Sequence, residues 1–146
     1  METFAKNKRA NFDYEILETF EAGLALSGSE AKSIMAGRAT IAGAHVVVRA
    51  NEAFLVGADV PPYQAKNTSE RYDASRTRKL LLNKKEISIL AGSASGKGLT
   101  IIPLKLYNRG GRVKLLLGVA RSKKKGDKRE AVKKRETERE LNRFRG

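Results

Sequence analysis

The sequence has 146 residues, of which 30 are Lys or Arg and 16 are Asp or Glu, so its formal net charge at pH 7 is +14. A positive excess of this size is typical of proteins that bind nucleic acids. The sequence has no cysteine and one histidine, which excludes disulfides and cysteine-ligated zinc and disfavours His-based metal clusters and Ser/His/Asp triads. No apolar run approaches the roughly 18 residues of a membrane span, and residues 1–8 lack a hydrophobic signal segment. We therefore expect a cytoplasmic protein without membrane contact.

The first half of the sequence predicts strands and one short helix. Residues 14–27 alternate in the manner of a β-strand and predict one long, curved strand. Residues 29–36 begin with a serine and are followed by Gly37, which predicts a short helix with a hydroxyl cap and a glycine stop. Two runs rich in β-branched residues, 45–50 and 53–58, predict a tight hairpin through the two residues between them.

The next elements are a long loop, a helix and a second hairpin. Residues 61–75 contain two prolines together with Asn, Ser, Thr and Asp and show no apolar period, so we expect a surface loop. Residues 83–91 open with a capping box and are followed by Gly92, which predicts a helix that ends there. Residues 99–107 and 112–120 flank a four-residue connection with two glycines and predict a hairpin.

These elements indicate the fold class. Five or six strands and two short helices follow one another without regular strand–helix alternation, which argues against a parallel α/β sheet. We therefore predict a mainly β (α+β) fold over residues 1–120, an OB-type antiparallel β-barrel with short flanking helices. Such a barrel closes its edges and leaves one face and its loops free for nucleic acid.

Residues 121–146 differ in composition from the rest of the chain. They hold 12 basic and 5 acidic side chains, so half of the net charge lies here, and their few apolar side chains are Ala131, Val132, Leu141 and Phe144. These do not offset the backbone entropy lost on ordering, about 1 kcal/mol or more per residue, so we predict a basic C-terminal tail that is disordered when free. Asp127 and the helix formers after it favour a helix that forms on an RNA surface. The alternative is a charged tail that only increases solubility.

Candidate catalytic groups are few. Residues 92–98 are one residue shorter than a phosphate-binding P-loop and follow a predicted helix instead of a strand. His45 heads an apolar strand and has no second histidine with which to share a metal, so a structural or surface role is favoured. Glu15, Glu18 and Glu21 lie on one predicted strand, where alternation places Glu15 and Glu21 on the same solvated face. We therefore expect no enzyme activity and no cofactor.

Two groups of cations are candidates for binding phosphate. Arg76, Arg78 and Lys79 stand where the long loop passes into an apolar segment that we expect to be buried, and Arg and Lys bind phosphates by paired donors and by point charge. The alternative is an ordinary basic loop that balances its own acidic residues. Lys105 and Lys114 fall on the two strands of the second hairpin, where they add to a basic face if they share a side.

Seven motifs in order make the sequence recognisable. They are Asn7–Ala10 with Asp13-Tyr14, Glu18–Leu24, Gly28–Ser33, Ala36–Arg38, Arg76–Leu82, Pro103–Tyr107 and Asp127–Arg129. Together they resemble the small protein B family of transfer-messenger RNA (SsrA RNA) binding proteins. The resemblance runs from about Asn7 to the C-terminus, with departures from the family pattern at Phe12, Met35 and Ser122.

The resemblance implies a function as well as a fold. It implies an OB-type barrel that binds the tRNA-like domain of transfer-messenger RNA and delivers this RNA to stalled ribosomes for trans-translation, without making or breaking a bond itself. The implied partners are transfer-messenger RNA, the ribosome (chiefly its small-subunit RNA) and elongation factor Tu, and the implied state is a monomer. The tail is expected to become helical on the ribosome. General RNA-binding barrels and RNA-modifying enzymes remain the alternatives.

The resemblance also assigns residues. It places an RNA-facing set at Asn7, Lys8, Arg9, Tyr14, Glu21, Leu81 and Lys114. It places a ribosome-binding set in the tail at Arg121, Lys123, Lys124, Lys125, Asp127, Lys128 and Arg129. A carboxylate such as that of Glu21, set among cations, can accept hydrogen bonds from the Watson–Crick edge of an unpaired guanine.

Overall fold

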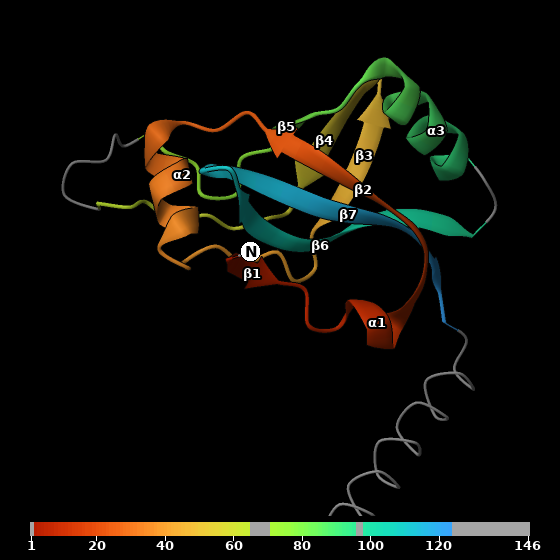
Figure 1. The fold of residues 1–146 in the computed structure, drawn as a ribbon, viewed down its shortest axis with the longest axis horizontal. Helices are drawn as coiled ribbons and strands as arrows, with labels where there is room; N and C mark the ends of the chain where they lie inside the picture. Colours follow the sequence, from red (N-terminus) through yellow and green to blue (C-terminus); the bar gives the residue numbers. More distant parts are fainter. Residues whose placement is uncertain (1, 65–70, 96–97, 124–146) are drawn as a thin grey trace, which may run out of the picture.

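In the computed structural model, which describes residues 2–64, 71–95 and 98–123, the chain folds around one curved antiparallel sheet (Figure 1). The described residues contribute seven strands to this sheet, in the order β1-β6-β7-β2-β5-β4-β3. The strands are β1 (Thr3–Lys6), β2 (Tyr14–Leu24), β3 (His45–Arg49), β4 (Glu52–Val56), β5 (Arg78–Leu81), β6 (Leu99–Arg109) and β7 (Arg112–Ser122). The helices are α1 (Ala10–Asp13), α2 (Gly28–Met35) and α3 (Lys84–Ala94).

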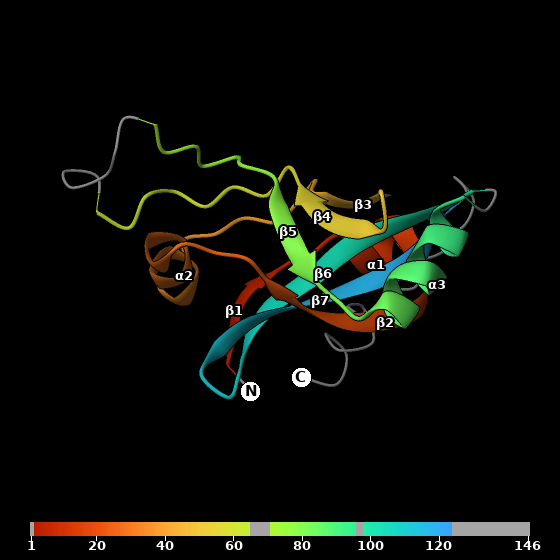
Figure 2. The ribbon, with the colours of Figure 1, turned by 90° about the horizontal axis from the view of Figure 1, so that it is seen from above.

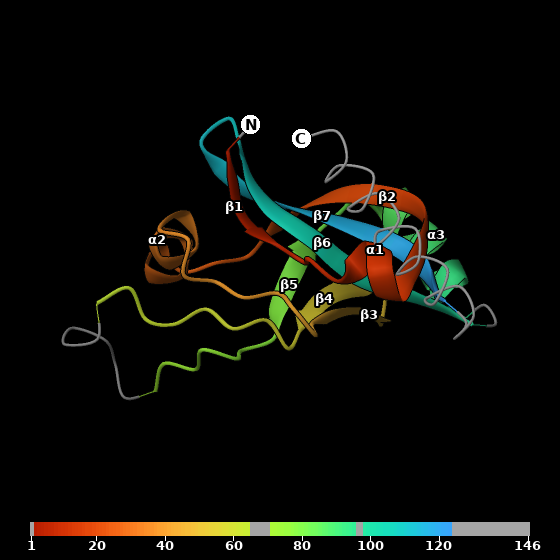
Figure 3. The same cartoon turned by 90° about the horizontal axis from the view of Figure 1, so that it is seen from below.

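The sheet curls over but does not close. Strands β1 and β3 are its two edges, and no hydrogen-bonded ladder joins them within the described part of the chain. Instead, β3 packs across β6, so that the β3–β4–β5 end of the sheet lies over the β6–β7 hairpin (Figures 2 and 3). The prediction of a mainly β, OB-type fold is confirmed, whereas the expected closure of the barrel edges is not found.

Both predicted hairpins are present, and their turns show why. The β6–β7 turn uses Gly110 and Gly111 at φ angles of 61° and 79°, a region that glycine enters without steric strain. The β3–β4 turn uses Ala50 and Asn51, also at positive φ, so it lies one residue earlier than predicted. Strand β7 continues to Ser122, so the first two residues assigned to the tail belong to the sheet.

A β-bulge in β2 changes which side chains share a face. Ile16 pairs with Ala120 and Glu18 pairs with Val119, so Leu17 is the extra residue and 48% of its surface is exposed. One inserted residue shifts the alternation, and Glu15 and Glu21 therefore lie on opposite faces of the sheet. The prediction that they share a face is wrong because nothing in the sequence marks the bulge.

The core lies on the concave side of the sheet. Its large buried apolar side chains include Leu55, Leu80, Ile101, Leu106, Leu115 and Leu117, joined by Ile34 of α2, Ile41 and Leu90 of α3. On the other face, Ala10 of α1 packs with Ile102 and Ala120 in a small second cluster. Helix α1 therefore covers one end of this second face of the sheet (Figure 1).

The predicted helices form with different ends, and the sequence did not predict β1, α1 or the strand character of β5. The N-cap of α2 is Ser27, whose hydroxyl accepts from the amide of Glu30 in a capping box, instead of Ser29. The predicted capping box at the start of α3 is confirmed, but the helix runs through Gly92. Strand β1 and helix α1 are short, and their sequence has no clear period.

A buried ion-pair network ties α2 to β5. The guanidinium of Arg78 is completely buried, with Nε 2.8 Å from Glu30 Oε2 and its remaining donors on backbone carbonyls of residues 58, 74 and 76. Arg76 donates from Nη2 to Glu30 Oε1 at 2.6 Å. The prediction that Arg78 binds phosphate is therefore wrong, because β5 turns its side chain inward and Glu30 neutralises it.

The network makes Glu30 the main acid-sensitive carboxylate of the fold. Burial alone would raise its pKa, but hydrogen bonds from Arg76, the Ser27 amide and Arg78 outweigh burial and lower the pKa from 4.5 to about 2. Because the folded-state pKa is lowered, this stabilisation is present above pH 4.5 and is lost as the pH falls from there towards 2. The shift corresponds to roughly 3 kcal/mol.

We predict that Glu30→Gln lowers the free energy of unfolding at pH 7 by about 3 kcal/mol or more, since it leaves Arg78 buried without a counter-charge. The difference from the parent chain should shrink between pH 4.5 and 2, as measured by urea denaturation across this range. The matched control is Glu15→Gln, which removes an exposed pair with Arg121 and should change stability by less than about 1 kcal/mol. A constant difference at all pH values would contradict the assignment.

Candidate nucleic-acid interface

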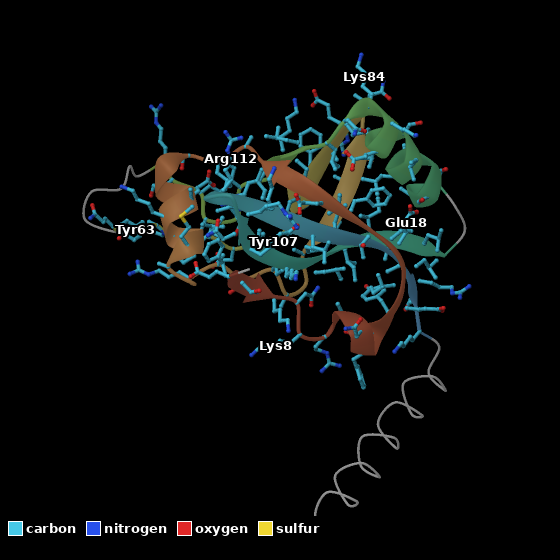
Figure 4. All side chains as sticks on the ribbon, viewed as in Figure 1. Lys8, Glu18, Tyr63, Lys84, Tyr107 and Arg112 are labelled. Atoms are coloured by element: carbon cyan, nitrogen blue, oxygen red, sulfur yellow. The ribbon has the colours of Figure 1, made fainter. Side chains whose placement is uncertain are left out.

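The convex side of β1, β6, β7, β2 and β5, here called the outer face, gathers four of the predicted RNA-binding side chains, Glu21, Leu81, Lys105 and Lys114. Strand register places Lys105 next to Leu116 and Tyr107 next to Lys114, so the two lysines share a side. Glu21 and Gly23 follow on β2, and Leu81 pairs with Gly23 from β5. Figure 4 shows Tyr107 near the middle of this face. The outer face is thus built from Lys6, Glu21, Leu81, Lys105, Tyr107, Arg109 and Lys114.

Glu21 is the carboxylate of the outer face. Its Oε2 accepts hydrogen bonds from the Tyr107 hydroxyl and, at 2.7 Å, from Arg109 Nε. The hydrogen bond from Tyr107 lowers the pKa of Glu21, burial opposes it, and the charge of Arg109 lowers the pKa further. Glu21 is therefore ionised at neutral pH. No donor within the described residues bonds its other oxygen, Oε1, and one third of the side chain is exposed.

Tyr107 positions this carboxylate instead of offering a surface for stacking. Only 2% of its surface is exposed, with Lys105 Nζ and the Arg109 guanidinium 5.2 and 5.8 Å from the centre of its ring. Burial and the contact with Glu21 raise the pKa of Tyr107 to about 12, so it remains a donor. Neither Tyr107 nor Arg109 is among the predicted binding residues. Tyr107 alternates with Lys105 on the predicted strand, whereas Arg109 falls in the predicted turn, and only the longer β6 of the structure places it on the same face.

A cavity of about 310 Å³ adjoins the outer face at its α2 end. Leu81 and Met35 expose 53% and 43% of their surfaces there, and Lys114 and Arg112 supply charge at its edge. Gly23 keeps this corner open, because a Cβ at that position would lie 3.3 Å from Leu81 Cβ and 3.6 Å from Lys114 Nζ. An apolar floor beside two cations suits a ribose or base edge next to its phosphate.

The N-terminal group of predicted residues lies at the other end of the outer face. Asn7 Nδ2 donates to the Pro103 carbonyl at 2.9 Å, beside the bulge in β6, so its amide helps to hold the N-terminal segment in place. Arg9 lies 4.8 Å from the Phe12 ring centre, and Lys8 is exposed (Figure 4). Asn7, Arg9 and Tyr14 line a second cavity, of about 530 Å³, together with His45.

The loop cations and the tail residues are placed differently from the prediction. Arg76 forms an ion pair with Glu30. Lys79 Nζ lies 3.3 Å from Glu52 Oε1, and the Lys79 side chain is on the same face of β5 as that of Leu81. Arg121 pairs with Glu15 at 2.7 Å, and Lys123 Nζ donates to the Asn11 carbonyl at 2.5 Å. The other predicted tail residues lie outside the described residues, namely Lys124, Lys125, Asp127, Lys128 and Arg129.

The described residues offer no obvious place for a metal. Within ranges 2–64, 71–95 and 98–123, no three His, Cys, Asp or Glu side chains come close enough to hold an ion. No helix in those ranges has the length and apolar character needed to cross a membrane. What the outer face does present is a set of cations that can bind phosphates and one ionised carboxylate that can accept base N–H groups, both of which are means of non-covalent recognition.

Comparisons with known proteins agree with this description. The family model described as SmpB protein matches residues 4–145. The SsrA-binding protein of Gloeobacter violaceus is 51% identical over 137 residues, covering 94% of this chain and 90% of that protein. The SsrA-binding protein of Thermosynechococcus vestitus is 46% identical over 143 residues, covering 98% of this chain and 94% of that protein. A solved chain described as "tmRNA-SmpB: a journey to the center of the bacterial ribosome" shares 45% identity with a TM-score of 0.68, covering 87% of this chain and 92% of that chain.

We predict that Tyr107→Phe raises the pKa of Glu21 towards its ordinary value, because the hydrogen bond that most lowers it is lost. The measurement is an NMR titration of the side-chain carboxyl carbons. Tyr14→Phe, which removes a hydroxyl from the α1 end of the outer face, should leave the Glu21 titration unchanged. A Glu21 pKa that is the same in Tyr107→Phe and in the parent chain would contradict the described geometry.

Proposed function

Because the chain belongs to the SmpB protein family, we propose that it binds transfer-messenger RNA and brings it to stalled ribosomes for trans-translation, in which the incomplete protein is tagged. The relatives reported above are named SsrA-binding proteins, and the description of the similar solved structure names tmRNA, SmpB and the bacterial ribosome. The family match spans nearly the whole chain, which supports carrying over the complete function and not only the fold.

The outer face is the proposed contact for the tRNA-like domain of transfer-messenger RNA. The observation that carries this proposal is Glu21, an ionised carboxylate fixed by Tyr107 and Arg109 with its Oε1 open. The N1 and N2 groups of an unpaired guanine are donors that fit such an acceptor, while Lys105 and Lys114 neutralise the adjoining phosphates. Leu81 lies beside this group and can pack against a base or ribose.

The α1 end of the outer face is proposed to extend the same contact. Lys8 and Arg9 are exposed cations, and Tyr14 lines the cavity that Arg9 borders. Asn7 acts through its hydrogen bond to Pro103, which positions the segment that carries Lys8 and Arg9. Arg76 and Lys79 are proposed as further phosphate contacts, because their side chains remain partly exposed although each pairs with a carboxylate.

The remaining partners are proposed from the family and from composition. The basic residues of the C-terminal tail are proposed to contact small-subunit ribosomal RNA, and elongation factor Tu is proposed to take part in delivery. The protein is proposed to act as a cytoplasmic monomer and to recognise RNA without catalysing a reaction. The bacterial ribosome named in the description of the similar solved structure supports the first of these proposals.

We predict that Glu21→Ala weakens binding to the tRNA-like domain of transfer-messenger RNA by about tenfold, although it makes the protein more positive. Pure electrostatic attraction would give the opposite sign. The affinities are measured by fluorescence anisotropy at matched salt. Glu15→Ala is the matched control. Glu15 lies on β2 like Glu21 and also forms an ion pair with an arginine, but its side chain is on the opposite face of the sheet.

Two results would contradict this proposal. Unchanged or tighter binding by Glu21→Ala would make Glu21 an ordinary solvated carboxylate. Equal affinity of the parent chain for transfer-messenger RNA, transfer RNA and an unrelated RNA would instead favour a general RNA-binding barrel.

We predict that removal of residues 127–146 leaves affinity for the tRNA-like domain largely intact but abolishes tagging of stalled products. The reason is that the proposed RNA contact lies on the sheet, whereas the tail is proposed to contact the ribosome. Tagging is followed in a reconstituted translation reaction on messages without a stop codon. Normal tagging by the shortened chain would contradict a separate function of the tail.

A further inference from the structure

A second cluster of cations and an aromatic ring lies on the far side of α2 from the outer face. Tyr63 follows two prolines in the long loop and exposes 36% of its surface. The Arg38 guanidinium lies 5.4 Å and Lys32 Nζ lies 6.0 Å from the centre of its ring. Figure 4 shows Tyr63 beyond α2, away from Tyr107. These three residues are called the Tyr63 cluster below.

Hydrogen bonds hold the Tyr63 cluster in place although Tyr63 belongs to a loop. Ser33 of α2 donates from Oγ to the Pro61 carbonyl at 2.6 Å, and Arg38 donates from Nη1 to the carbonyl of Tyr63 itself at 2.9 Å. The part of the loop that leads back to β5 is fixed as well, since the Tyr72 hydroxyl donates to the Val60 carbonyl at 2.6 Å. The ring and its cations are therefore positioned before any ligand binds, which lowers the entropy lost on binding.

The cations of the Tyr63 cluster have no acidic partner among the described residues. No carboxylate of residues 2–64, 71–95 and 98–123 forms an ion pair with Lys32 or Arg38, in contrast to Arg76, Arg78, Lys79, Arg109 and Arg121, each of which has one. Two cations beside an exposed aromatic ring match the chemistry of single-stranded RNA, in which a base stacks on the ring and the flanking phosphates contact the cations.

The Tyr63 cluster is connected to the outer face through α2. Met35 lies one turn beyond Lys32 on this helix and lines the cavity that Leu81 and Lys114 also border. The buried pair of Glu30 with Arg78 fixes the helix against the sheet, so the two surfaces keep a constant relative position. A continuous path therefore runs from the outer face, over the exposed Met35, to Tyr63.

We propose that the Tyr63 cluster is a second contact for the RNA that the outer face binds, with an unpaired base stacked on Tyr63 and its phosphates held by Lys32 and Arg38. The inference rests on the proposed function, because it identifies the occupant by continuity with the outer face. It adds a site on a different element and assigns it a different chemistry, stacking and phosphate contact instead of base-edge hydrogen bonding.

The test uses the full chain and full-length transfer-messenger RNA. Tyr63→Ala should weaken binding about fivefold or more, whereas Tyr63→Phe, which keeps the ring, should bind as the parent chain does. Lys32→Ala combined with Arg38→Ala should weaken binding and reduce the slope of log affinity against log salt by about 1 to 2. The matched control removes two lysines from the opposite end of the molecule, Lys84→Ala with Lys85→Ala on α3 (Figure 4), and should leave the affinity closer to that of the parent chain.

Chemical footprinting separates this proposal from the one before it. In the complex with Tyr63→Ala, the RNA should lose protection at nucleotides that remain protected in the complex with Glu21→Ala.

If Glu21→Ala weakens binding but Tyr63→Ala and the Lys32, Arg38 double variant do not, the second contact is wrong and the proposed function stands. If Glu21→Ala leaves binding unchanged while Tyr63→Ala weakens it, the outer face is wrong as the primary site. The proposal is also overturned if the Lys32, Arg38 double variant and the Lys84, Lys85 double variant weaken binding equally. The cluster would then contribute only through the overall positive charge of the protein.

Discussion

The buried carboxylate of Glu30 is the constraint on which the arrangement of this protein depends. Arg78 enters the core with its whole side chain, and a buried guanidinium without a counter-charge would destabilise the fold strongly. Because Glu30 is the residue that neutralises it, α2 has to sit against the start of β5. That position brings Met35 beside Leu81 and makes α2 the border of the outer face. The shape of the proposed RNA-binding surface therefore depends on the ion pair of Glu30 with Arg78, which is buried inside the protein.

Two bulges then decide which side chains reach the outer face. The bulge at Leu17 in β2 places Glu21 on the convex side, and the irregularity between Pro103 and Lys105 in β6 does the same for Lys105 and the residues after it. Without the bulge in β2, Glu21 would point towards the core, where a carboxylate is unfavourable. Irregularities in the sheet thus supply the alignment of Glu21 with Tyr107 and Arg109 that regular alternation would not.

The sequence predicts what depends on local interactions and misses what depends on distant partners. The capping box of α3 and the glycine turn of the β6–β7 hairpin involve neighbours within a few residues, and both were predicted. Arg78 was misassigned because Glu30 lies 48 residues away, and a basic loop before a strand has the same appearance whether its arginine points outward or inward. The role of Glu21 was inferred from a family resemblance, whereas its hydrogen bond to Tyr107 spans 86 residues and required the register of three strands.

The presence of a carboxylate in a basic surface has a physical consequence for selectivity. A face made only of cations binds any RNA through its phosphates, with affinity set by salt and not by sequence. An ionised Glu21 repels that backbone and therefore weakens nonspecific binding. Its Oε1 regains the lost free energy only where an RNA presents base N–H donors at the right place, and Tyr107 and Arg109 hold the group so that little rotational freedom is lost in doing so. In the proposed contact, the repulsive residue contributes more than the surrounding lysines to distinguishing one folded RNA from others.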